Sequence, residues 1–421
     1  MRKVPALAAY GVSLFVGFGI LTLFLAARWP TSVVEAGLLI QAAALLAWAG
    51  FRDVRLHWHP VLLPVGCTAI GSALQASTGF SAAPWLSGEK SLQYAATFAA
   101  LLLIAQTANR SAWRARLSTA LLVFGTLLSL VTLLHVASAT GKAFWLFETG
   151  YTELVAGPFV SRNTFAQFVE ILFPLALYQA IRWRRRAPLM VFVAGILFAS
   201  EVAGASRAGT LILLAEIPLV LWLSHHQGLI SRRTVALYML CLTGALAFLA
   251  FFVGWNSLLA RLGEDPVTDL RWPIMSSSFN MLKDHLWLGV GYGAWPVVYP
   301  QYATFDLGLV VNQAHCDWLQ MAGEGGIAGL GLFVWSIATL FKGLLRSVWG
   351  IGFFGVLCHA CVDFPFQHRP AFTIFLFCAA LLAASGAARP TRVHRTSHRG
   401  HDRPRHRSRH SLPERSAEFP A

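Results

Sequence analysis

Charged side chains are scarce in this sequence of 421 residues: only 12% are Asp, Glu, Lys or Arg, whereas 56% are hydrophobic. Soluble domains carry roughly 25% charged residues. The shortage therefore excludes an ordinary soluble protein and indicates a polytopic membrane protein. The six cysteines (67, 241, 316, 358, 361 and 378) are scattered and form no paired framework. Most of them are expected to be small buried apolar residues rather than partners in disulfides.

Several motifs of metal and nucleotide chemistry are also absent. The sequence has no Asp-x-Asp pair to hold a divalent cation against a diphosphate, no Walker loop and no His-Glu-x-x-His. Cys358-His359-Ala360-Cys361 has a metal-like spacing, but it lies in an apolar segment without a second ligand pair. Neither a metal nor another cofactor is expected. A reaction on a phosphate-bearing substrate would then need arginines in place of a metal ion.

Twelve apolar segments, each near the ~20 residues that cross hydrocarbon, predict an all-α protein with about twelve transmembrane helices. They are 4–27, 31–50, 60–77, 91–108, 117–138, 165–182, 187–205, 208–224, 234–254, 327–345, 347–362 and 371–388. The first resembles a signal peptide, but its apolar run is too long and lacks a convincing cleavage site. Helices one to nine thus fill residues 1–254, a large loop follows at 255–326, and helices ten to twelve fill 327–388.

The basic residues are distributed unevenly between the two sides of this predicted topology. With a cytoplasmic amino terminus, 24 of the 33 Lys and Arg residues fall on the cytoplasmic side. The positive-inside rule therefore places both termini in the cytoplasm and the large loop outside, in the periplasm of a bacterium with two membranes. Residues 389–421 predict a basic, disordered cytoplasmic tail near anionic membrane lipid, and a nucleic-acid partner is not expected.

The loop at 255–326 is predicted to fold as a cap with amphipathic helices. Pro273 can open a helix, and Gly289, Gly291 and Gly293 can end it in a turn. Trp295, Tyr299 and Tyr302 follow as interfacial aromatics. The apolar face of the helix would consist of Met275, Phe279, Leu282 and Leu286, at helical spacing. Further along, Gly323, Gly325, Gly326 and Gly329 allow a break between a short surface helix and the tenth span.

Nine basic residues remain on the outer side, and three of them stand at informative places. Arg162 lies at the mouth of the sixth span, Arg207 in a tight turn between spans seven and eight, and Arg271 in the cap. Each could be an interfacial anchor. Together they could converge on an anionic group, because the planar guanidinium binds phosphate with two parallel hydrogen bonds.

His315 precedes the tenth span, in Gln313-Ala314-His315-Cys316-Asp317. It is either a hydrogen-bonded interfacial histidine or a general base, since imidazole titrates near working pH. Three glutamates inside predicted spans, Glu170, Glu201 and Glu216, favour a different class of protein, a transporter. The absence of an internal repeat counts against that alternative.

Residues 155–375 resemble the bacterial O-antigen ligase and polysaccharide polymerase family. The resemblance rests on the order of short motifs rather than on any one of them. They are Gly157-Pro158-Phe159 with Arg162-Asn163-x-Phe165; Ser206-Arg207-Ala208-Gly209; Arg271 followed by Asp284-His285-x3-Gly289-x-Gly291; Tyr299-Pro300-x-Tyr302; His315-Cys316-x9-Gly326-x2-Gly329; and Val362-Asp363-Phe364-Pro365. One departure is Cys316, where the family usually has an amide or hydroxyl side chain.

The resemblance implies a metal-independent, inverting glycosyltransferase of the helical membrane (GT-C-like) type. Its donor would be a glycan on undecaprenyl diphosphate. The acceptor would be lipid A–core in a ligase, which the histidine-glycine pattern favours, another glycan in a polymerase, or a protein in an oligosaccharyltransferase. By position, Arg207 and Arg271 would hold the diphosphate and His315 would deprotonate or orient the acceptor. Arg162, Asn163, Tyr299 and Gly291 would contact the substrate.

Overall fold

The computed structural model describes residues 3–138, 141–149, 156–253, 266–306, 308 and 310–385. The basic tail and the stretch 254–265 lie outside these residues. The described part is helical except for a short antiparallel hairpin of β1 (Lys142–Ala143) and β2 (Phe147–Glu148). Its longer helices are α1 (Lys3–Leu21), α2 (Trp29–Phe51), α3 (Leu62–Ser77), α4 (Pro84–Ala108), α5 (Ser111–Ser138), α6 (Arg162–Arg182), α7 (Ala187–Gly204), α8 (Arg207–His226), α9 (Arg232–Val253), α11 (Pro266–Asp284), α13 (Asp317–Leu344), α14 (Val348–His359) and α15 (Pro370–Ser385).

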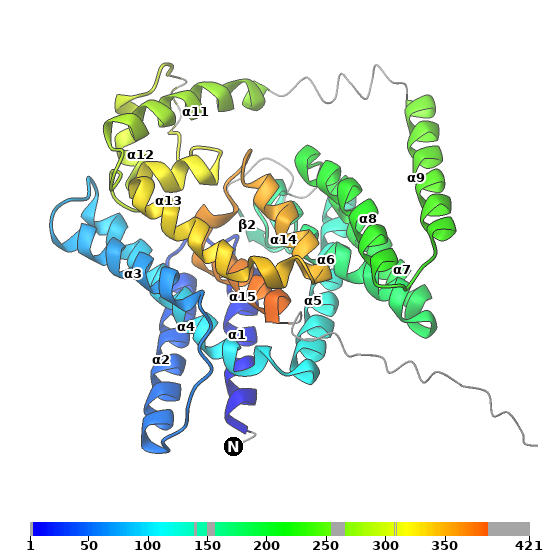
Figure 1. Ribbon diagram of the computed structural model, residues 1–421. Helices are drawn as coiled ribbons and strands as arrows, with labels where there is room; N and C mark the ends of the chain where they lie inside the picture. Colours follow the sequence, from blue (N-terminus) through cyan, green and yellow to red (C-terminus); the bar gives the residue numbers. More distant parts are fainter. Residues whose placement is uncertain are drawn as a thin grey trace, which may run out of the picture. The chain divides into compact units, whose positions relative to one another are not determined.

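Each of the twelve predicted spans coincides with one of these helices (Figure 1), so the all-α prediction is confirmed. Seven helices in the described residues are long and apolar enough to cross a membrane: α2, α4, α5, α6, α7 with its preceding turn, α8 and α13. Four shorter apolar segments fall on α1, α3, α14 and α15. The count of twelve crossings stays a prediction.

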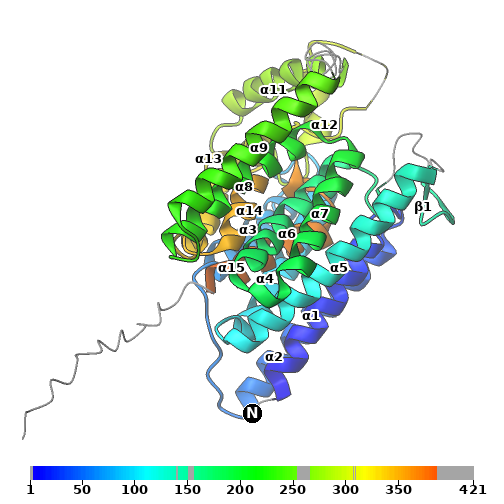
Figure 2. The ribbon, with the colours of Figure 1, turned by 90° about the vertical axis from the view of Figure 1, so that its right-hand side faces the viewer.

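The interior of the helical domain is built around α4, α6 and α15. In α4 and α6, 78% of the residues in the apolar stretch of membrane-crossing length are buried. In the other five helices of that length, the buried share is 33–39%. α15 is buried along nearly its whole length and packs against α1, α4, α13 and α14 (Figure 2). Small residues permit these close approaches, as is usual between membrane helices. A Cβ added at Gly352 of α14 would lie 2.2 Å from the Glu170 carbonyl oxygen of α6.

The segment after residue 266 forms the cap, which consists of α11, α12 (Trp295–Val298) and the short turn η2 (Tyr299–Gln301). The predicted helix start at Pro273 is wrong, because α11 already begins at Pro266 and Pro273 lies inside it. The predicted apolar face is not the face that packs inward, although its Met275 and Leu282 are half-buried. Ile274, Ser277, Ser278 and Met281 are buried, whereas Phe279 is 51% exposed and Leu286 40% exposed. The exposed apolar side chains therefore face outward from the cap.

A break in α13 joins the cap to the helical domain. Gly326, inside α13, has φ 62° and ψ −163°, which only glycine adopts readily. The turn after α11 crosses this break: the Val290 amide donates to the Gly323 carbonyl at 2.9 Å, and the Ile327 amide donates to the Leu286 carbonyl at 2.8 Å. The turn thus satisfies backbone groups that the break leaves without helical partners. The break predicted from the glycines is confirmed.

Candidate functional site

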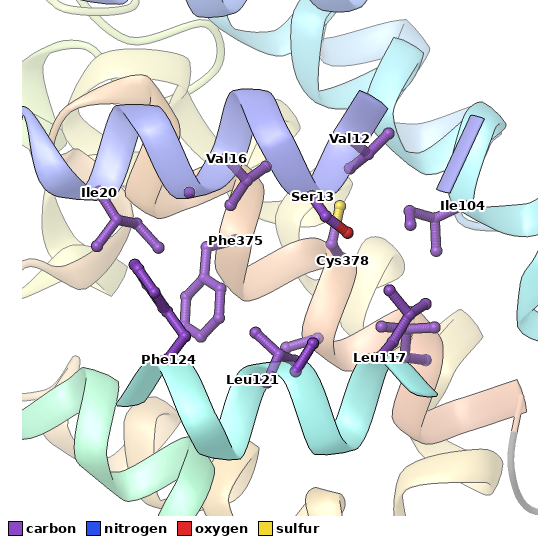
Figure 3. A pocket seen from close by; sticks show the side chains of 14 residues that line it. Val12, Ser13, Val16, Ile20, Ile104, Leu117, Leu121, Phe124, Phe375 and Cys378 are labelled. Atoms are coloured by element: carbon purple, nitrogen blue, oxygen red, sulfur yellow. The ribbon is translucent and has the colours of Figure 1, made fainter. Parts of the chain in front are cut away.

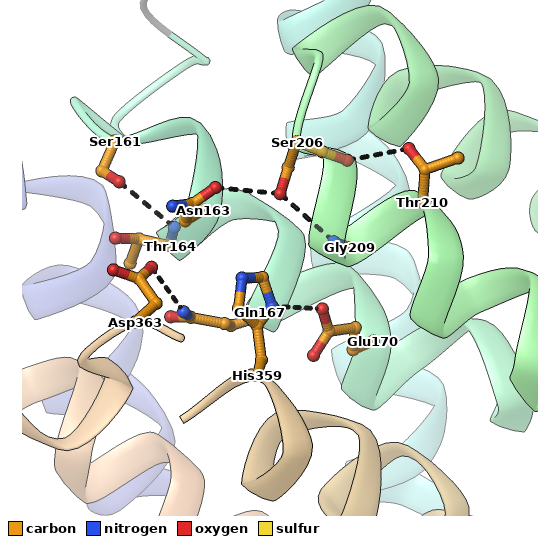
Figure 4. Close-up of polar contacts among 10 residues, drawn as sticks. All are labelled: Ser161, Asn163, Thr164, Gln167, Glu170, Ser206, Gly209, Thr210, His359 and Asp363. Carbon is orange, nitrogen blue, oxygen red and sulfur yellow. Dashed lines mark hydrogen bonds and ion pairs between the residues drawn. The ribbon is translucent and has the colours of Figure 1, made fainter. Parts of the chain in front are cut away.

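Two helix amino termini meet at the site. Ser161 caps α6 by accepting a hydrogen bond from the Thr164 amide, and Ser206 caps α8 by accepting one from the Gly209 amide at 3.3 Å. The Ser206 hydroxyl also donates to Asn163 Oδ1 at 2.9 Å (Figure 4). This bond brings the Arg162-Asn163 and Ser206-Arg207 segments together. The amino ends of helices favour anions, because their free amides and aligned dipoles present positive charge.

His315 lies in the loop before α13 in a strained conformation. Its φ is +52°, which is uncommon for a residue with a side chain. The ring packs edge-on against Phe364, with centroids 5.3 Å apart, and Nδ1 is buried without a hydrogen-bond partner among the described residues. Burial lowers the pKa of His315 below its usual 6.5; the Asp363 carboxylate opposes this shift and the Arg271 guanidinium adds to it. The imidazole is therefore neutral at neutral pH, with an unused nitrogen.

Arg271 reaches the site from the cap. Its side chain is half-buried, and its Nε atom has no hydrogen-bond partner within the part of the chain that the structure describes. Its positive charge contributes to lowering the pKa of His315. A cation held this way, with a buried donor unused, is suited to receive an anionic ligand.

A layer of buried polar pairs lies beneath these residues. Gln167 of α6 donates to the Asp363 carboxylate at 2.9 Å, and one turn further Glu170 pairs with His359 Nδ1 at 2.7 Å (Figure 4). Asp317, at the start of α13, accepts a 2.7 Å hydrogen bond from the Phe366 amide. These pairs join α6, α13 and the 360–368 loop, and so fix the elements that carry Arg162 and His315.

A cavity of about 380 Å³ opens beside the amino terminus of α6. Ser161, Thr164, Gln313 and His368 contribute polar groups to its lining, and Leu23 and Phe24 at the end of α1 contribute apolar ones. The Thr164 hydroxyl is hydrogen-bonded to His368 Nε2. Burial lowers the pKa of His368 to about 4, so this ring is neutral and adds no charge to the cavity.

Two other predicted site residues, Tyr299 and Gly291, have positions that packing explains. Tyr299 is 2% exposed, and its ring stacks on Trp295 in the core of the cap, with centroids 4.4 Å apart. Gly291 has φ +110° and packs so closely that an added Cβ would lie 2.1 Å from the Ser81 hydroxyl. Cys316 is the residue before α13, and its side chain makes no capping hydrogen bond. Contacts of Tyr299 and Gly291 with a substrate stay predictions.

Asp317, Asp363 and Gln167 were not predicted as site residues. Asp363 belongs to the Val362-Asp363-Phe364-Pro365 motif, whereas the only signal of Asp317 and Gln167 was a polar side chain inside or beside an apolar segment. Of the three glutamates that suggested a transporter, Glu170 is paired with His359, while the buried carboxyls of Glu201 and Glu216 have no hydrogen-bond partner among the described residues.

The Cys-His-Ala-Cys segment is divided between the two sides of its helix end. Cys358 and Cys361 are exposed, whereas His359 points inward to Glu170. Within the described residues, no group of three or more His, Cys, Asp or Glu side chains is placed to hold a metal ion.

Helices of membrane-crossing length, with a polar site where two of them begin, define a multi-pass membrane protein. A family model described as O-antigen ligase matches residues 192–334. The matched segment runs from α7 through the cap into α13 and contains Arg207, Arg271 and His315. Residues 192–334 of this membrane protein are thus similar to the O-antigen ligase family, and the family resemblance is confirmed for that segment. A comparison with curated proteins found none that matches.

Proposed function

We propose that this protein is a glycosyltransferase that moves a glycan from undecaprenyl diphosphate to an acceptor hydroxyl at the periplasmic face of the inner membrane. Lipid A–core is the favoured acceptor. The observation that carries the proposal is the paired start of α6 and α8, at the Ser206–Asn163 hydrogen bond, linked through the 363–368 loop to His315. Cationic groups and a neutral base are what transfer from a diphosphate requires.

The arginines act on the leaving group. When the anomeric carbon–oxygen bond breaks, negative charge develops on the departing diphosphate. Arg207 and Arg162, the first residues of α8 and α6, supply guanidinium groups there, with Arg271 from the cap. Fixed cations stabilise developing charge most strongly in a site that excludes water. These three charges take the place of a metal ion in this proposal.

His315 acts on the acceptor. The acceptor oxygen forms a bond to the anomeric carbon on the face opposite the diphosphate, so the configuration inverts. The hydroxyl proton passes to the neutral His315 imidazole. A general base of this kind contributes about 10²–10⁴-fold to the rate. The Asp363 carboxylate nearby stabilises the imidazolium that forms.

The proposal is tested with purified protein, an undecaprenyl diphosphate-linked glycan and lipid A–core. His315→Ala should lower turnover by at least about 10²-fold without lowering the amount of folded protein. His285→Ala is the matched control, because His285 is exposed just after α11 and should tolerate the change. Turnover of His315→Ala at the wild-type rate would remove the histidine from the mechanism.

Glycan analysis of a deletion strain separates the alternatives. Polymer lost from lipid A–core but retained on its lipid carrier indicates a ligase, and single repeats on the carrier indicate a polymerase. Loss of glycan from protein alone indicates a protein O-oligosaccharyltransferase. Unchanged surface glycans would contradict all three and favour transport, the function that the buried Glu201 and Glu216 carboxyls suggest.

A further inference from the structure

A narrow apolar groove runs between α1 and α5, with α15 behind it (Figure 3). Its volume is about 200 Å³. The side chains of α1 and α5 face each other across it at helical spacing. The lining consists of Val12, Ser13, Val16, Gly17 and Ile20 of α1, Leu117, Ala120, Leu121 and Phe124 of α5, Phe375, Cys378, Ala379 and Leu382 of α15, and Ile104 of α4.

The side chains that line the groove leave no polar group without a partner. Ser13 has the one hydroxyl in the lining, and that hydroxyl already donates to the Ala9 carbonyl of its own helix at 2.8 Å. The thiol of Cys378 behaves as a small apolar group. Ser13 and Ala120 are exposed at the rim, whereas Phe375 is 2% exposed at the back. The groove is therefore open at its side and suited to a hydrocarbon chain.

The Ile20 end of the groove approaches the polar cavity at the start of α6. Ile20 lines the groove, and Leu23 and Phe24, one turn further along the same segment, line the polar cavity. Phenylalanine rings connect the two spaces in the same way. Phe375 of the groove contacts Phe168 with centroids 5.3 Å apart, and Phe168 contacts Phe159 of the cavity, also at 5.3 Å. One continuous apolar wall thus ends at polar groups.

We propose that this groove holds the prenyl chain of the lipid diphosphate donor, with the diphosphate in the polar cavity at the groove's end. The inference rests on the proposed function for the identity of the donor. It adds the path of the chain: along α1 from Ile20 toward Val12, against α5 and α15. A long apolar chain attached to a charged head matches an apolar groove that leads to a polar cavity lined by Arg369. A phospholipid acyl chain is the competing occupant that the experiment separates.

Gly17 allows the groove to be filled without disturbing the helices. A Cβ added there meets no atom within 4 Å, and leucine favours a helix. Gly17→Leu should raise the KM for a long-chain donor about tenfold, which corresponds to about 1.4 kcal/mol, or roughly two buried methylene groups. The KM for a donor with one or two isoprene units should change little. Gly195→Leu is the control, because Gly195 of α7 also has open space and lies outside the groove.

A second measurement does not need catalysis or the variant. Wild-type protein in nanodiscs is incubated with a long-chain prenyl diphosphate that carries a photoreactive group in its tail, and the cross-linked peptides are mapped. Cross-links in 12–20 and 117–124 that excess unlabelled prenyl diphosphate prevents, and excess phosphatidylglycerol does not, support the groove. Cross-links elsewhere, or equal competition by phosphatidylglycerol, overturn it. Specific cross-links in a protein that transfers no glycan would sustain the groove and contradict the proposed transfer reaction.

Discussion

Arg207→Lys separates the charge of this residue from its geometry. Arg207 is the first residue of α8, directly after Ser206, which caps the helix and is bonded to Asn163. Lysine keeps a cation at the same helix end, so its interaction with the helix dipole and with the membrane surface is preserved. It loses the planar fork that binds two phosphate oxygens at once. If Arg207 grips the diphosphate, activity should fall while folding is unaffected.

The size of the loss follows from one hydrogen bond. A hydrogen bond to a charged group contributes about 1.5–3 kcal/mol, and about 1.4 kcal/mol corresponds to tenfold in rate. Arg207→Lys should therefore lower turnover roughly ten- to a hundredfold. The assay is release of undecaprenyl diphosphate by each purified variant, normalised to folded protein. Arg182→Lys, exposed at the other end of α6, is the control. Full turnover in Arg207→Lys would reduce Arg207 to an interfacial anchor and leave Arg271 as the main diphosphate ligand.

Four further predictions concern the break in α13, the site loop and the arginines. Gly326→Ala should destabilise the protein by about 1–3 kcal/mol in thermal unfolding, because φ 62° with ψ −163° is nearly restricted to glycine; Gly331→Ala, with open space in the same helix, should not. Cys316→Asn should retain activity and raise the unfolding free energy by about 1 kcal/mol, since asparagine caps a helix; inactivation would contradict the matching of this position to the family. The acid limb of the pH–kcat/KM profile should lie below 6.5, because the pKa of His315 is lowered and its neutral form is the base; a limb above 7 would exclude it. Turnover should be unchanged by EDTA, because arginines take the place of a metal ion in the proposal; loss of turnover in EDTA, with recovery on adding magnesium or manganese, would refute that role of the arginines.

The positions of the helices could be predicted from the sequence because apolar length is a strong local signal. The face of the cap helix that packs inward could not be predicted in this way. Phe279 and Leu286 have the spacing of a buried face, yet Ile274 and Met281 are the residues that pack inward, with two serines between them. Burial there is decided by what lies opposite the helix, which the local spacing of apolar residues does not encode.

The site was predictable only in part, for the same reason. Unusual residues at helix ends, such as Arg162, Arg207 and His315, stand out against an apolar background. The buried polar residues that hold these helix ends in place do not stand out in the same way. Gln167 pairs with Asp363 across 196 residues of sequence, and Glu170 pairs with His359 across 189. No local sequence pattern predicts a pair with so large a sequence separation. Until its partner is known, a buried glutamate is equally consistent with an ion path.

The placing of the two arginines bears on what the site is for. A cation at a helix amino terminus opposes the dipole and costs about 0.3–1 kcal/mol in each case. Both α6 and α8 nevertheless begin with arginine, and the Ser206–Asn163 bond holds the two ends together. A fold selected for stability alone would place acids there. An anion placed between the two adjoining helix ends would receive charge-assisted hydrogen bonds from both guanidinium groups. The arrangement therefore favours a diphosphate-binding role over simple anchoring, and it predicts that a bound prenyl diphosphate raises the thermal stability of the protein.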